Sequence, residues 1–64
     1  MITLELSPEN AEALEALLRR ELTDLKVEIH RTDSWDFREE LRVRQSRLAE
    51  CLKQLEEARG RAAA

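Results

Sequence analysis

Apolar residues recur at helical spacing along two long stretches of the chain, and the two stretches mirror each other. At spacings of three or four, one face of a helix would carry Ala11, Leu14, Leu18, Leu22, Leu25 and Ile29. The second stretch repeats these spacings in reverse order, with one basic residue among its apolar ones: Phe37, Leu41, Arg44, Leu48, Leu52 and Leu55. Reflection about Asp33 places one series on the other. This symmetry predicts an all-α fold, an antiparallel two-helix hairpin with a tight turn.

The first helix has a clear start signal. Ser7 can cap free backbone N–H groups, Pro8 fits the first helical position, and Glu9 complements the positive end of a helix. No helix-breaking residue follows for more than twenty positions. The first helix is therefore predicted over residues 8–31.

The second helix is predicted over residues 34–59. Gly60 is the expected stop, since glycine is common just beyond the end of a helix, and residues 60–64 are expected to form a frayed tail. The turn holds residues that favour caps, but the pattern does not decide which of them opens the helix. Two pairs fit a capping box: Asp33 with Asp36, or Asp36 with Glu39.

Residues 1–6 precede the first helix as an arm with a different pattern. Ile2, Leu4 and Leu6 alternate with polar residues, which is typical of a strand. A strand in an otherwise helical chain needs a partner for its backbone groups. The arm is therefore expected either to pair across a dimer or to stay extended.

The chain is predicted to form a single helical-hairpin domain over residues 1–64. A domain of this length is too short to build a large core. Cys51 is the only cysteine, so an internal disulfide is excluded, and with His30 it offers too few ligands for a structural zinc site. Leu17 and Cys51 widen the two apolar stripes on flanks that one hairpin would leave in water. Two hairpins packed together would cover them, so a homodimeric four-helix bundle is predicted.

Arg44 is the polar exception in the second stripe. Its stem could pack while its guanidinium reaches the edge of the stripe, where Glu21 or Glu28 of either chain could meet it. A polar residue in a helical seam can also fix register and oligomeric state. The functional alternative is a positive charge held ready for an anionic ligand.

No motif supports catalysis or a cofactor. The chain lacks a glycine-rich phosphate loop, a nucleophile elbow and a metal-binding histidine pair, so no catalytic, cofactor-binding or metal-binding residue is assigned. His30 is better explained as a basic residue near the end of a helix than as a general base. The expected function is a non-enzymatic protein-interaction or regulatory module. Its expected partners are a second copy of the chain and another protein, which the sequence does not identify, and no membrane partner is expected.

Two features of the second helix qualify this expectation. Arg38, Arg42 and Lys53 lie along one side of it, which makes a small RNA- or DNA-binding regulator the alternative function. Against that alternative, acidic residues border the basic side and the net charge is −3. Trp35 lies off the stripe at the bend, where it either covers the bend or contacts a partner protein.

The segments Leu4–Glu9 and Thr32–Leu41 carry a resemblance. They contain an L-x-L-[ST]-P-E opening and a T-D-x-x-x-[FY]-R turn, and in this they resemble a group of small uncharacterised bacterial proteins of about this length. The resemblance implies a hairpin fold and a bacterial cytosolic origin, and it carries over no functional residue. A cytoplasmic location also fits the lone cysteine and the absence of a signal peptide or a long apolar run.

Overall fold

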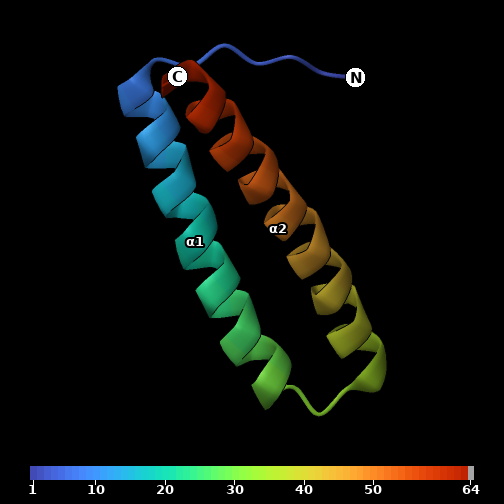
Figure 1. Ribbon diagram of the computed structural model, residues 1–64. Helices are drawn as coiled ribbons and strands as arrows, with labels where there is room; N and C mark the ends of the chain where they lie inside the picture. The colour runs from blue at the N-terminus through green and yellow to red at the C-terminus, as the bar shows by residue number, and fades with distance from the viewer. Residues whose placement is uncertain (64) are drawn as a thin grey trace.

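The computed structural model describes residues 1–63, which form two α-helices joined by a short turn (Figure 1). Helix α1 spans Pro8–Arg31 and helix α2 spans Trp35–Ala63. The helices run antiparallel and pack against each other, which confirms the all-α hairpin. The described residues contain no strand, and the arm before α1 is extended and crosses the open end of the hairpin.

Helix α1 has the start that the sequence predicts. The Ser7 side chain accepts a hydrogen bond from the backbone N–H of Asn10 at 3.2 Å, and Pro8 is the first helical residue. At the other end the backbone N–H of Thr32 donates to the carbonyl of Glu28 at 3.0 Å. The helix therefore covers the predicted range 8–31 and leaves the chain extended at Thr32.

Helix α2 begins with a cap that the sequence analysis did not select. The Ser34 Oγ accepts a hydrogen bond from the N–H of Phe37 at 3.3 Å, and the Ser34 carbonyl accepts one from the N–H of Arg38 at 3.0 Å. Ser34 directly precedes the first helical residue, and a side chain at that place can reach the third backbone N–H of the helix. Ser34 thus holds the cap position in place of either pair of carboxylates.

Helix α2 also continues past its predicted end at residue 59 as far as Ala63. Gly60 lies within the helix, because its φ is not positive and it does not adopt the left-handed conformation that ends many helices. Arginine and alanine, which follow it, are among the best helix formers. The predicted frayed tail over residues 60–64 is therefore wrong up to Ala63, and Ala64 lies outside the described residues.

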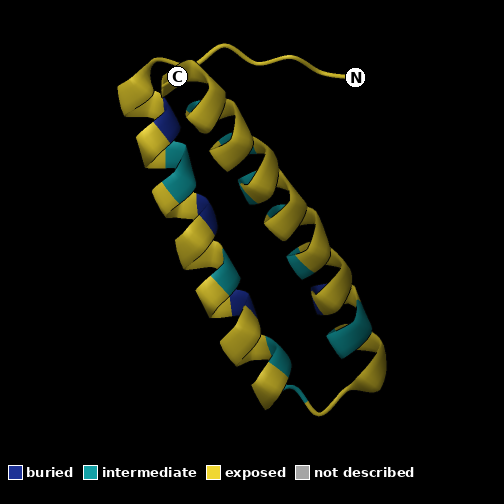
Figure 2. Cartoon of the chain, viewed as in Figure 1, coloured by how far each residue is buried: buried dark blue, intermediate teal, exposed yellow. Residues whose placement is uncertain are grey.

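The core is a narrow seam between the helices (Figure 2). Leu25 and Leu41 are almost fully buried, at 1% and 2% exposure, and they anchor the seam from opposite helices. Leu14, Leu22 and Ile29 on α1 are only half-buried. Among the described residues the buried apolar set is short: Ala11, Leu18, Leu25 and Leu41.

The seam of α2 departs from the predicted stripe at two positions. Phe37 is 44% exposed and Arg44 is exposed, so neither lies in the hairpin seam. Their places are taken by the next residue along the chain in each case, Arg38 and Gln45, which are partly buried. The resulting seam has the alternating three- and four-residue spacing of a coiled coil: Arg38, Leu41, Gln45, Leu48, Leu52, Leu55 and Arg59.

Candidate interaction surfaces

Cysteine and histidine, two residues that often bind metals or act in catalysis, occur once each in residues 1–63. This part of the chain contains no group of three His, Cys, Asp or Glu residues that could hold a metal ion. Neither of its helices is long and apolar enough to cross a bilayer. Cys51 is a free, exposed thiol. His30 lies in the last turn of α1, where the negative end of the helix dipole stabilises a basic group.

One face of the hairpin carries ion pairs that join the two helices near their open end. Glu15 of α1 accepts hydrogen bonds from Arg19 at 3.0 Å and from Arg59 of α2 at 2.5 Å. Arg19 also donates to Glu56 of α2 at 2.7 Å. We call Glu15, Arg19, Glu56 and Arg59 the ion-pair cluster. It links residues 44 positions apart in the chain.

The ion-pair cluster changes the acid–base properties of its members. The hydrogen bond from Arg19, followed by that from Arg59, holds the pKa of the Glu15 carboxyl below its ordinary value of 4.5. The same hydrogen bond to Glu15, followed by the negative charge of Glu56, raises the pKa of Arg19. Both shifts favour the charged forms, so Glu15 and Arg19 stay ionised at neutral pH.

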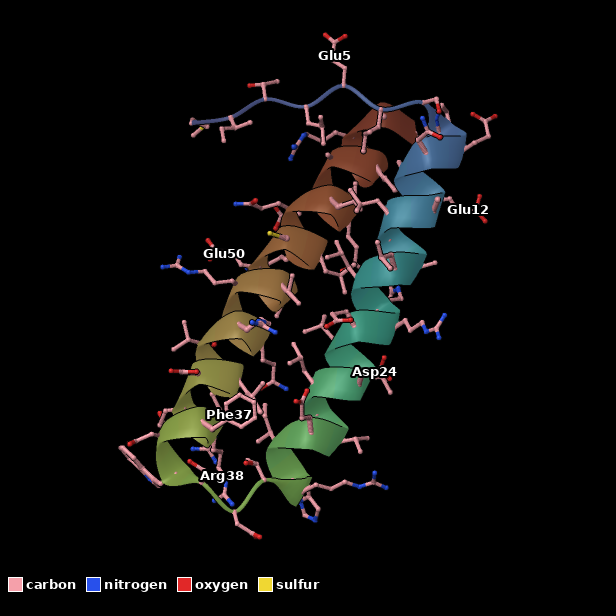
Figure 3. The ribbon with its side chains drawn as sticks, turned by 180° about the vertical axis from the view of Figure 1, so that it is seen from behind. Glu5, Glu12, Asp24, Phe37, Arg38 and Glu50 are labelled. Atoms are coloured by element: carbon pink, nitrogen blue, oxygen red, sulfur yellow. The ribbon has the colours of Figure 1, made fainter. Side chains whose placement is uncertain are left out.

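The opposite face of the hairpin is apolar. At about 100° per residue, Leu14 and Leu17 lie on the side of α1 away from Arg19. The Arg19–Glu56 pair joins the side of α1 that carries Arg19 to the side of α2 that carries Glu56. The opposite sides of the two helices therefore also form a common face. Figure 3 shows the ring of Phe37 over the space between the helices on this face. We call the following six residues the apolar face: Leu14, Leu17, Phe37, Leu48, Cys51 and Leu55.

The apolar face is only partly covered by the hairpin itself. Leu17 is 61% exposed and Phe37 is 44% exposed. Cys51 is exposed, and the remaining members are half-buried. Exposure of Leu17 and Cys51 is what the sequence predicts for the flanks of a single hairpin. An apolar surface that runs along both helices is typical of a site of protein association.

Charged residues lie among and beside the members of the apolar face. Glu21 and Glu28 of α1 and Arg44 of α2 are exposed, and helical spacing places them on this side of the seam. None of them takes part in the four ion pairs of residues 1–63. Exposed Glu40 lies on the same side of α2, so α2 contributes both an acidic and a basic group here, while α1 contributes acidic groups.

Arg38 closes the bend at the other end of the hairpin. Its Nη2 donates to the carbonyl of Thr32 at 2.6 Å, and Thr32 is the residue that directly follows α1. Its Nε is buried, with no hydrogen-bond partner in residues 1–63. Trp35, which opens α2, is 69% exposed and does not cover the bend. Arg38 therefore has a structural role at the turn, whereas Trp35 is free to contact a partner.

The basic residues assigned to α2 are brought only partly together. Arg38 and Arg42 line a shallow hollow of about 280 Å³ with Ile29 and His30. Arg42 also pairs with Glu39 at 3.2 Å, which offsets its charge. Lys53 lies eleven residues further on, about 16 Å along the helix. The three do not form one compact basic site.

The N-terminal arm forms a second hollow where it crosses the open end of the hairpin. The hollow measures about 510 Å³, and its wall includes Leu4 and Leu6 of the arm and Leu55, Ala58 and Ala62 of α2. Leu4 remains 69% exposed and Ile2 remains 94% exposed, so the hairpin alone does not bury the apolar residues of the arm.

Sequence reasoning missed two contributors to these surfaces. The role of Arg38 at the bend depends on the free carbonyl of Thr32, which only the end of α1 reveals. The ion-pair cluster joins residues far apart in the chain, although the Glu15–Arg19 spacing of four is a recognisable signal for its local part.

Comparison with models of protein families, with curated proteins and with solved structures finds no match to this chain.

Proposed function

We propose that this chain is a non-enzymatic, cytosolic protein that works as a homodimeric four-helix bundle and serves as a protein-interaction or regulatory module. The observation that carries the proposal is the apolar face, which extends along both helices beside a thin seam. Leu17 alone leaves three-fifths of its surface in water. A second hairpin with the same face would cover it by closed twofold association.

The energetics of a small chain support the same proposal. A domain of this size has a marginal core, and four buried apolar residues contribute little compared with the ordering of 64 residues. A single cysteine provides no disulfide to compensate. Dimerisation would add the half-buried leucines of both chains to a common core, which is how small helical proteins commonly gain stability.

Sedimentation equilibrium over a range of concentrations tests the dimer. We expect a mass twice the 7.5 kDa of the chain at micromolar concentration. Leu17→Lys should shift the equilibrium to monomer, since it places a charge in the apolar face. Val43→Lys is the matched control, because Val43 is 59% exposed against 61% for Leu17 but lies on the outer side of α2. Equal effects of the two variants, or a monomeric wild type, would contradict the proposal.

The interaction role rests on Trp35 at the bend. A large aromatic side chain that is 69% exposed is a frequent anchor of protein interfaces. A photo-crosslinking amino acid at position 35, introduced in the native host, should capture a different protein. The same group at Glu50, which points outward from the middle of α2 (Figure 3), should not capture it. Identical products from the two positions would refute a role for the bend.

The alternative is a regulator that binds nucleic acid through Arg38, Arg42 and Lys53. Two contacts weaken it, since Arg38 is engaged with the Thr32 carbonyl and Arg42 with Glu39. The net charge of −3 also opposes approach to phosphates. A mobility shift with mixed RNA and DNA at low salt, lost as salt rises, would favour this alternative over the interaction module.

A further inference from the structure

Four basic side chains lie on one side of the hairpin, next to the bend. We call them the basic cluster: Lys26 and His30 of α1, and Arg38 and Arg42 of α2. The two on α1 follow Arg19 by seven and eleven residues, about two and three helical turns, so they lie on the same side of α1 as Arg19. The two on α2 precede Glu56 by eighteen and fourteen residues, about five and four turns, so they lie on the same side of α2 as Glu56. Because Arg19 and Glu56 form an ion pair, these two sides face the same way.

Acidic residues offset the charge of the basic cluster only in part. The helical turns next to the bend also carry acidic residues: Asp24, Glu28, Asp36, Glu39 and Glu40. Helical spacing places only Glu39 on the side of the basic cluster, where it pairs with Arg42 at 3.2 Å, and Asp33 lies in the turn itself. The negative end of α1 lies beside the positive end of α2 here, so the two helix dipoles oppose each other. The bend therefore keeps a local excess of positive charge, although the chain as a whole carries −3.

The hollow between the members of the basic cluster suits a protein side chain. His30, Arg38 and Arg42 line it together with Ile29, and it measures about 280 Å³. Sites for small molecules usually measure about 300–1,000 Å³ and are mostly apolar, so this hollow is small and polar for such a ligand. A carboxylate side chain suits it better, because the planar N–H groups of arginine match the two oxygens of a carboxylate.

Arg38 carries a donor for which the hairpin supplies no acceptor. Its Nη2 donates to the carbonyl of Thr32 at 2.6 Å, which holds the guanidinium at the bend (Figure 3). Its Nε is buried and has no hydrogen-bond partner in residues 1–63. Buried donors in folded proteins nearly always have a partner. An acceptor beside this guanidinium would complete its hydrogen bonds, which indicates an anionic ligand in the adjoining hollow.

Trp35 adds an apolar contact on the same side of α2. It precedes Arg42 by seven residues, about two helical turns, and it is 69% exposed. Tryptophan and arginine are both enriched among the residues that dominate the affinity of protein interfaces. A ligand with an apolar group next to its carboxylate could contact both kinds of side chain at once.

We infer that the hollow at the bend binds a carboxylate of an acidic protein segment, with Arg38 and Arg42 holding the carboxylate and Trp35 packing against an apolar side chain next to it. This inference rests on the proposed interaction role of the bend and names the chemistry of its partner. Clusters of arginine recognise acidic motifs in this way. Nucleic acid fits less well, because Lys53, the next basic residue on this side of α2, lies about 16 Å beyond Arg42. The negative charge of the whole chain also repels a long polyanion more than a short acidic segment.

Titration with a defined peptide, followed by heteronuclear NMR, tests the inference. The probe is a short acetylated peptide with glutamates on both sides of a central leucine, and the reference peptide has glutamine in place of each glutamate. We expect the acidic peptide to shift the signals of His30, Arg42 and the indole N–H of Trp35. The glutamine peptide should bind at least about tenfold more weakly, because it lacks the charge that the guanidinium groups bind. Shifts spread over the whole hairpin, no shifts at the bend, or tighter binding of single-stranded DNA of equal charge would overturn the inference.

Two substitutions at the bend should change the affinity for the acidic peptide in opposite directions. Arg42→Gln should weaken binding about fivefold, whereas Glu39→Gln should tighten it about threefold, because it removes the carboxylate that competes for Arg42. Arg47→Gln is the matched control, since Arg47 is also exposed but lies on the outer side of α2. Far-UV circular dichroism checks that each variant keeps its helices. Equal effects of Arg42→Gln and Arg47→Gln, or weaker binding after Glu39→Gln, would refute the site.

Photo-crosslinking at position 35 separates this inference from the proposed function. A crosslinked product that is lost in Arg42→Gln but kept in Arg47→Gln supports an acidic partner at the bend. A product that Arg42→Gln leaves unchanged overturns the acidic partner but leaves the interaction role standing. The absence of both a crosslinked product and peptide binding would overturn both.

Discussion

Replacement of Leu25 by alanine tests whether the narrow seam holds the hairpin together. Leu25 is 1% exposed, so the three carbon atoms that the substitution removes are fully out of water. At about 0.8 kcal/mol per methylene, their burial contributes about 2.4 kcal/mol, and the space left behind adds to the loss. We expect Leu25→Ala to lower the free energy of unfolding by about 3 kcal/mol.

A loss of this size should be conspicuous in so small a protein. At typical values per residue, 64 residues would have a stability of about 3–10 kcal/mol. Leu25→Ala would therefore remove between a third and nearly all of it. Val43→Ala is the control, because Val43 is 59% exposed and the two carbons removed should cost only about 0.7 kcal/mol.

Urea unfolding followed by far-UV circular dichroism measures both variants. Wild type and variants are compared at one protein concentration, since dimerisation makes stability depend on concentration. If Leu25→Ala costs no more than Val43→Ala, the seam is not the source of stability, and the reasoning from burial is wrong.

Three further predictions concern the ion-pair cluster, the cap of α2 and its C-terminal end. Because folding lowers the pKa of Glu15, chiefly through the Arg19 hydrogen bond, its ion pairs add stability above the ordinary value of 4.5, and this is lost as pH falls through the lower folded pKa. Glu15→Gln should thus lower Tm at neutral pH and by less in acid, and an equal loss at both pH values would count against the cluster. Ser34→Ala should lower the free energy of unfolding in urea by about 1 kcal/mol, whereas Ser34→Asp should lower it little, because only alanine removes the cap. Equal losses in the two variants would exclude the cap as the cause. Gly60→Ala should raise stability by about 0.5–1 kcal/mol, since a Cβ at this helical position meets nothing within 4 Å, and a fall in Tm would show that α2 ends before it.

Much of the hairpin could be predicted from the sequence because its signals are local. The start of α1 depends on Ser7 and Pro8, which act within one helical turn, and the structure has the predicted cap. The mirrored leucines likewise define two faces that bury each other whatever the details of the turn. Leu25 and Leu41, a mirrored pair near the bend, are the two most buried leucines.

The errors in the predicted seam arise where the more apolar residue is not the one that packs between the helices. Phe37 is more apolar than Arg38, so a search for an apolar stripe selects the phenylalanine. The seam instead uses the aliphatic stem of Arg38, because its guanidinium can reach the Thr32 carbonyl at the bend. The predicted stripe thus differs from the seam at two positions, with Phe37 in place of Arg38 and Arg44 in place of Gln45, and agrees with it at the leucines of α2.

The candidate interaction surfaces could be predicted only in part from the sequence. Exposure of Leu17 followed from the width of the apolar stripe and is what the structure has. The side of the hairpin on which Arg44 lies could not be predicted. Arg44 was assigned to the seam itself, and that assignment does not show on which side of the seam a residue lies. Interhelical pairs such as Glu15 with Arg59 depend on the side-to-side relation of the helices, which periodicity alone leaves open.

The two ends of the hairpin are fastened by contacts of very different sequence separation, and this has a consequence for the order of folding. Arg38 and Thr32 are 6 residues apart, whereas Arg59 and Glu15 are 44 apart. Closing the longer loop first would cost about 1.8 kcal/mol more in chain entropy. The helices should therefore associate progressively from the bend, and local opening should begin at the far end. In native-state hydrogen exchange, amides near Leu14 and Leu55 would then lose protection before those near Leu25 and Leu41.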